Sequence, residues 1–126
     1  MQTPPRLEAA ADLRLVGGLE TFLGRKDAVL LAQVRLTQSL QCAASIAGIG
    51  YRQALDHVRS INAWAGRPLV ESHQGGSGGG STTLTPLGER ILDLYTEASK
   101  EHQRWLQELN QRLKPELAWT LKETPQ

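Results

Sequence analysis

The sequence predicts a mainly α-helical fold with one small β-hairpin, arranged as a winged helix-turn-helix that leads into a long C-terminal helix. Three observations within the 126 residues carry this prediction. Between positions 39 and 65, a short Ala-rich stretch and a longer amphipathic stretch are separated by glycines. Two strand-like stretches then flank a glycine-rich run. Finally, apolar residues recur at helical spacing as far as a proline.

The composition is that of one globular domain that can bury its own core. Its 40% apolar residues contain no run suited to a signal peptide or a membrane span. The single cysteine cannot form an internal disulfide, which fits a cytoplasmic protein. The net charge is +1, but positions 25–80 hold six basic and three acidic residues, against six and seven from position 81 onward. This mildly basic stretch is weak support for a nucleic-acid partner.

The first third of the chain is less clearly patterned. Residues 1–11 are expected to fray, and residues 12–23 fit either a strand that breaks at Gly17-Gly18 or a short amphipathic segment. Residues 25–36 have the apolar stripe of a core-packing helix. Cys42, in the next short helix, is expected to fill the core.

The helix-turn-helix prediction depends on small residues and glycines. A helix that begins at Ser39 or Gln41 would stop at Gly48, where a left-handed residue ends many helices. Its alanines allow a second helix to cross closely. That second helix is predicted over residues 51–65, between two glycines. On a helical wheel its apolar residues share one face. The opposite face carries Arg52, Gln53, Asp56 and Arg59.

The glycine-rich run at positions 74–81 has three interpretations. It fails as a phosphate cradle, because no Lys-Ser or Lys-Thr follows and the next element is a strand. An engineered linker fits its composition. A wing tip is favoured, because the strand-like residues 69–73 and 82–85 flank it. Backbone amides at Gly76, Ser77 and Gly78 could then approach DNA closely.

The last element is a long helix with Thr85 as its cap, Pro86 in its first turn and an expected end at Pro115. It would be roughly 40 Å long, more than one small domain can cover. A second copy is therefore expected to pack on it. The predicted dimerisation residues are Leu87, Ile91, Leu94, Ala98, Trp105, Leu109 and Leu113. The expected domains are residues 1–85, which form the winged helix-turn-helix, and residues 86–126, which form the dimerisation helix and tail.

Three runs carry a family resemblance: A-G-I-G-Y-R-Q-A-L-D-H-V, L-V-E-S-H-Q-G-G-S-G-G-G and L-T-P-L-G-E-R-I-L-D-L-Y. Over residues 13–113 the chain resembles the N-terminal DNA-binding domain of the molybdate-responsive (ModE) regulators, and more distantly the head of LysR-type regulators. The resemblance implies a winged helix-turn-helix that dimerises through its long helix and binds a two-fold symmetric operator.

Two departures from the family pattern remove cations. The wing has Ser77 where the family usually has Lys, and Glu71-Ser72 stands where Glu-Arg is usual. The family's C-terminal oxyanion-binding modules would not fit before Gln126, so molybdate binding is not expected.

These observations together predict a bacterial, homodimeric transcriptional regulator that binds specific double-stranded DNA and has no fused sensor domain. Arg52, Gln53, Asp56 and Arg59 would read a major groove, and Tyr51 could reach a phosphate. Taken alone, such a polar face is as typical of an ordinary solvated helix. An alternative is a protein-interaction module that sequesters or modulates a related full-length regulator. A weaker possibility is an effector pocket at the dimer seam near Trp105.

Other chemistries have little support in the sequence. The three histidines, His57, His73 and His102, have no ligand at metal-site spacing, so no metal or other cofactor is expected. No nucleophile elbow or triad order appears, so an enzyme is not expected. The three tryptophans are expected in packing or at a dimer seam. Stacking on nucleobases is the minor alternative.

Overall fold

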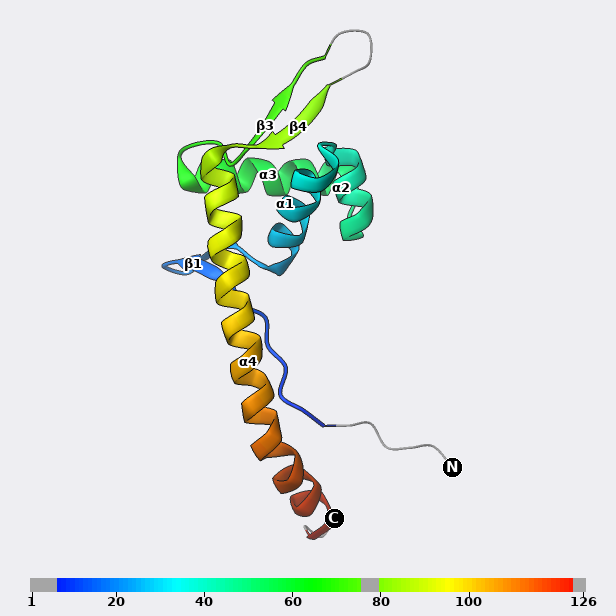
Figure 1. Ribbon diagram of the computed structural model, residues 1–126, viewed down its shortest axis with the longest axis vertical. Coiled ribbons are helices and arrows are strands. Elements are labelled where there is room, and N and C mark those ends of the chain that lie inside the picture. The colour runs from blue at the N-terminus through cyan, green and yellow to red at the C-terminus, as the bar shows by residue number, and fades with distance from the viewer. Residues whose placement is uncertain (1–6, 76–79, 124–126) are drawn as a thin grey trace.

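The computed structural model describes residues 7–75 and 80–123, and it confirms a winged helix-turn-helix with a long C-terminal helix (Figure 1). Within these residues the order is β1 (Leu15–Gly17), β2 (Glu20–Leu23), α1 (Arg25–Thr37), α2 (Leu40–Ala47), α3 (Tyr51–Ala65), β3 (Val70–His73), β4 (Ser81–Leu84) and α4 (Pro86–Glu123). Helices α1, α2 and α3 form a compact head. The β3–β4 hairpin projects from one end of the head, and α4 extends away from it in the opposite direction.

The core lies where α1, α2, α3 and the first turns of α4 meet. Its large side chains with under 2% exposure are Leu23, Leu30, Leu31, Val34, Ile61, Leu69 and Leu92. Ala43, Ala44 and Ala54 are also buried at the contact between α2 and α3. Their small size allows the two helices to cross closely, as the sequence predicts.

The turns around α2 explain where this helix begins and ends. Ser39 is its N-cap, with its hydroxyl oxygen accepting a hydrogen bond from the Cys42 backbone N–H at 3.1 Å. Gly48 ends the helix at φ 75°, a left-handed conformation that glycine adopts without strain. Cys42 itself is exposed, so its expected place in the core is wrong. The neighbouring Ala43 and Ala44 turn inward instead, which leaves Cys42 on the opposite face.

The start of α4 is held tightly against the strand before the wing. The Thr85 hydroxyl accepts a hydrogen bond from the Gly88 N–H at 3.0 Å, which confirms Thr85 as the cap. The same hydroxyl donates to the Pro68 carbonyl at 2.8 Å. A Cβ at Gly88 would lie 2.2 Å from the Leu69 carbonyl oxygen, so only glycine allows this approach.

The expected end of the last helix at Pro115 is wrong, because α4 continues through this residue to Glu123. Proline lacks an N–H and therefore removes one hydrogen bond of the helix. The carbonyl left without a partner is that of Gln111, which is exposed, so water can satisfy it.

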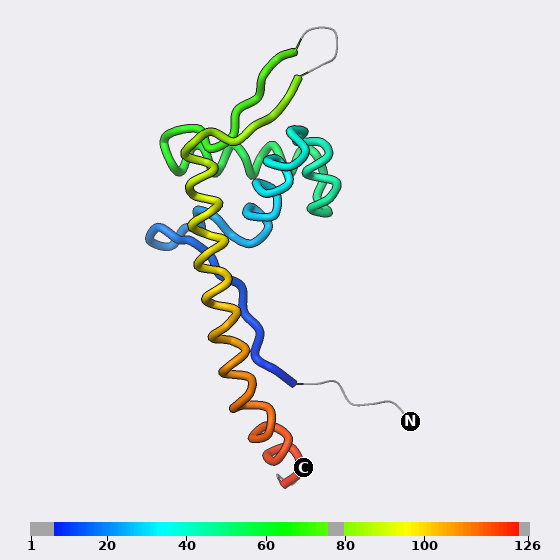
Figure 2. Tube along the Cα trace, viewed as in Figure 1, coloured from blue at the N-terminus to red at the C-terminus, as the bar shows by residue number. Residues whose placement is uncertain are grey.

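The N-terminal segments are also more ordered than the sequence suggests. Residues 15–23 form an antiparallel hairpin that turns at Gly18, which supports the strand alternative. The chain before it lies along α4 (Figure 2). The Asn110 side chain accepts a hydrogen bond from the Ala9 N–H at 2.7 Å and donates to the Ala9 carbonyl at 2.9 Å. The expected fraying of residues 1–11 is therefore wrong near Ala9, while residues 1–6 lie outside the described part.

Candidate nucleic-acid interface

Helix α3 presents the polar face that the sequence predicts. Ala54 and Ile61 are buried on one side, with 0% and 2% exposure. The opposite side exposes Tyr51, Arg52, Gln53, Asp56 and Arg59. Across residues 7–75 and 80–123, no ion pair engages the charged members of this group. Their charged ends are therefore available to a partner.

Two polar contacts hold α3 in place. At one, the Asp27 carboxylate at the start of α1 lies 2.6 Å from Nδ1 of His57 on α3, while its other oxygen accepts from the Gly24 N–H at 2.8 Å. At the other, Oδ1 of Asn62 accepts from the Leu69 N–H at 2.8 Å, and its amide nitrogen donates to the Val70 carbonyl at 3.2 Å. The first contact ties α3 to α1, and the second ties it to the base of the wing.

None of these anchoring contacts is predicted from the sequence. Asn62 falls on the apolar face of the helical wheel, and a polar residue among apolar ones is a signal that could have been followed. The pairing of Asp27 with His57 joins positions 30 apart, which no local pattern shows.

The wing is an antiparallel hairpin in which Val70 pairs with Leu84 and His73 with Ser81. Its strands agree with the expected positions to within a residue. Gly76, Ser77 and Gly78, predicted to touch DNA, lie outside the described residues. The Thr82 N–H donates to the Gln38 carbonyl at 2.9 Å, which ties the wing to the turn between α1 and α2.

A groove of about 460 Å³ lies between the outer part of the wing strands and the first turns of α2 and α3. Its polar side chains come from Ser39, Gln41, Tyr51, Ser72, His73, Gln74, Ser81 and Thr82. Apart from Tyr51, none was predicted as a site residue, because the groove forms only when three separate segments meet.

Helix α4 buries one face against its own chain and leaves an adjacent face uncovered. Gly88, Leu92, Tyr95 and Leu106 are buried. In the predicted dimerisation stripe, Leu94 is 43% and Trp105 54% exposed, and Ala98 is exposed too. The other members are half-buried; these are Leu87, Ile91, Leu109 and Leu113.

The opposite flank of α4 contacts α1. Arg35 of α1 bonds Asp93 at 2.9 Å and Glu89 at 3.2 Å, and these hydrogen bonds raise the pKa of Arg35. Asp93 lies about 100° and Glu89 about 60° around the helix from Leu92 on one side, whereas Ile91 lies about 100° to the other side. The exposed members of the stripe, Leu94, Ala98 and Trp105, therefore lie away from the contacts with Arg35.

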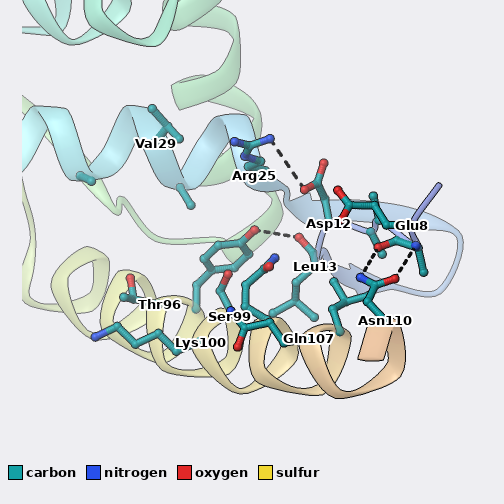
Figure 3. A pocket seen from close by; sticks show the side chains of 18 of the residues that line it. Glu8, Asp12, Leu13, Arg25, Val29, Thr96, Ser99, Lys100, Gln107 and Asn110 are labelled. Carbon is teal, nitrogen blue, oxygen red and sulfur yellow. Dashed lines mark hydrogen bonds and ion pairs between the residues drawn. The ribbon is translucent and has the colours of Figure 1, made fainter. Parts of the chain in front are cut away.

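A second groove, of about 910 Å³, runs between α1, α4 and the N-terminal arm (Figure 3). It is lined by charges of both signs, including Asp12, Arg25 and Lys100. The Tyr95 hydroxyl donates to the Leu13 carbonyl at 2.8 Å, and burial, together with the nearby charge of Asp12, raises the pKa of Tyr95. Trp105 does not line this groove, so it is separate from the effector pocket suggested by the sequence.

The remaining expectations concern metal sites, membrane spans and the three tryptophans. No group of three His, Cys, Asp or Glu side chains in the described ranges could hold a metal ion. Within the same ranges, no helix is long and apolar enough to cross a membrane. Trp64 stacks on Phe22 with ring centroids 4.6 Å apart, which is a packing role. Trp119, like Trp105, is exposed on α4.

Comparisons with known proteins point to one kind of relative. No family model matches the chain. The transcriptional regulator ModE of Haemophilus influenzae is 39% identical over 83 residues, which are 64% of this chain and 32% of that protein. The DNA-binding transcriptional dual regulator ModE of Escherichia coli K12 is 39% identical over 66 residues, 52% of this chain and 25% of its own. The molybdenum-pterin-binding protein MopB of Rhodobacter capsulatus is 36% identical over 73 residues, 58% of this chain and 27% of that protein. The chain thus spans less than a third of the length of these relatives.

Proposed function

We propose, from the premise that this chain is a homologue of the N-terminal region of the ModE transcriptional regulators, that it is a homodimeric head that binds specific duplex DNA sites. One observation carries the proposal above the others. On its inner side, helix α3 is anchored by His57, which contacts Asp27 of α1, and by Asn62. Its outer side presents polar side chains that have no partner within the described residues. A rigid helix with such a face, next to a wing, has the geometry of a recognition helix.

The side chains on this face have distinct roles in the proposal. Arg52 would pair with guanine, Gln53 with adenine, and Asp56 would accept from cytosine. Arg59, two turns into the helix, would reach a phosphate or a further base. Tyr51 would donate its hydroxyl to a phosphate. The wing tip at positions 76–78 would meet the adjacent backbone.

The exposed stripe on α4 supports the dimer. Residues 1–85 would read DNA, and residues 86–126 would pair two heads and set the distance between half-sites, which gives a two-fold symmetric site. We assign no ligand sensing to this head, and the molybdenum in the names of some relatives is not carried over to it. Regulation of transcription in a bacterium places the protein in the cytoplasm.

A protein-interaction module is the second candidate. The net charge is only +1, and Ser72 and Ser77 stand where the family usually has cations. The uncovered stripe around Leu94 and Trp105 could then pair with a related full-length regulator and keep it from its site.

The test is selection of bound duplexes from a random pool, followed by a salt titration on the winner. A DNA reader enriches one motif with two-fold symmetry and loses affinity steeply as salt rises. Arg52→Ala should weaken binding to the selected site by about 1–3 kcal/mol. Arg104→Ala, an exposed change on α4 outside the apolar stripe, is the matched control and should bind like the parent. Failure to enrich any motif would shift the weight to the interaction module.

A further inference from the structure

The groove between α2 and the wing has an unusual lining for the surface of this protein. Every described residue along it is neutral or histidine, with no Asp, Glu, Lys or Arg. The groove beside α4, by contrast, contains the carboxylates of Glu8 and Asp12. A pocket that offers hydroxyl and amide groups without a carboxylate suits an anion that accepts hydrogen bonds.

A backbone hydrogen bond and a buried leucine fix the position of the two walls of this groove, and neither uses a polar side chain of the lining. The Thr82 N–H bonds the Gln38 carbonyl, and Gln38 itself takes a left-handed conformation at φ 56°. Leu40 is 6% exposed and closes the floor. In the described part of the chain, Gln41 and Ser72 have no side-chain hydrogen bond. Gln41 lines the groove from α2, and Ser72 lines it from β3.

The groove also adjoins the start of the recognition helix. Tyr51, the first residue of α3, lines it, and Arg52 follows directly on the exposed face. A duplex with α3 in its major groove would bring a sugar-phosphate strand along this side of the helix.

We propose that this groove seats one DNA phosphate per protomer through neutral donors, with the Gln41 amide supplied by α2 and the Ser72 hydroxyl by β3. The inference rests on the proposed function and assigns the backbone contact to residues outside the predicted reading face. Amide and hydroxyl groups commonly bind phosphate oxygens and set the position of a protein on the duplex. This position would fix how Arg52 and Gln53 meet the bases.

Neutral and cationic phosphate contacts differ in how they affect the salt dependence of DNA binding. Counterions are released when Lys or Arg neutralises a phosphate, and this release sets the salt dependence of binding. Gln41→Ala should therefore weaken binding about five- to tenfold on every sequence and leave the salt slope unchanged. Gln41→Lys should restore affinity and steepen the slope by about 1.

The decisive experiment uses the full chain and the selected duplex, with an uncharged methylphosphonate placed at one backbone position at a time. The parent should lose affinity at several positions, and at one of them in each half-site the loss of about five- to tenfold should depend on Gln41. Gln41→Ala should be indifferent to that position while still preferring the selected sequence. Arg52→Ala should keep the sensitivity. Gln111→Ala, an exposed change on α4, is the matched control and should behave like the parent.

The outcomes distinguish this inference from the proposed function. If the duplex binds and no methylphosphonate position depends on Gln41, the groove is not a phosphate seat, and the reading helix is unaffected. If no duplex is ever selected, the proposed function itself fails. Thermal unfolding followed by circular dichroism shows whether Gln41→Ala is folded. Gln41→Glu, of nearly the same size, should reduce binding further by repelling the phosphate.

Discussion

Asp27 is the one charged residue in the described ranges that counts as buried, with 9% exposure. It joins the start of α1 to the middle of α3, because one oxygen contacts His57 and the other accepts from the Gly24 N–H. A buried polar group is costly only when its partners are missing. The contact therefore stabilises the position of α3 against α1 within the head.

Replacing this carboxylate tests its part in the fold. Asp27→Ala should lower the free energy of unfolding by about 1–3 kcal/mol, because it leaves the Gly24 N–H and the His57 ring without their acceptor. Asp56→Ala, on the exposed face of α3, is the matched control and should change it by less than about 0.5 kcal/mol. Urea unfolding measures both. Equal effects would mean that the buried contact contributes nothing beyond the loss of a charge.

Residues whose role is local were the ones that sequence could predict. Gly48 ends α2 and Thr85 caps α4, because capping depends on positions a few residues apart. The two faces of α3 followed from helical periodicity. The pair of Asp27 and His57 could not be found this way, because it meets only after α1 and α3 have packed. The groove lined by Gln41 and Ser72 likewise needs α2 and the wing to come together.

At the scale of elements, two N-terminal segments also depend on contacts that the local sequence does not show. The hairpin over residues 15–23 and a short amphipathic segment have similar patterns, and packing of Phe22 on Trp64 favours the hairpin. The arm before it has no periodicity at all, yet Asn110 binds both backbone groups of Ala9. Tertiary contacts decided both cases.

Pro115 gives the clearest test at this scale. Carbon-13 Cα shifts of residues 116–123 should be helical in the parent protein, since α4 runs to Glu123. Pro115→Ala should keep these shifts and slow amide exchange in the last turns, because it restores an N–H and removes a clash that costs roughly 3 kcal/mol in a helix interior. Pro86→Ala, at the first helical position, should leave exchange there unchanged. Random-coil shifts after position 115 in the parent would contradict the continuous helix.

At the scale of the whole molecule, the head packs around a core, whereas much of α4 is covered by little else in the chain. The head surrounds its core on all sides, whereas α4 extends far beyond it with only the arm alongside (Figure 1). Trp105, Trp119 and Leu121 are more than half exposed along that extension. An exposed apolar surface of this kind along a helix is typical of an interaction face.

The last prediction concerns this pairing face. Leu94→Glu places a charge in the middle of the uncovered stripe, where a second copy would have to desolvate it, so it should convert a dimer into a monomer. Gln107→Glu makes the same change of charge in the groove on the other side of α4 and should leave the dimer intact. Sedimentation equilibrium distinguishes the 13.8 kDa chain from its dimer. The Leu94→Glu monomer should also lose most affinity for a two-fold symmetric site and bind single half-sites like the parent, because α4 no longer holds two heads together. A parent protein that is monomeric at micromolar concentration, or a Leu94→Glu variant that still pairs, would show that the stripe has another role.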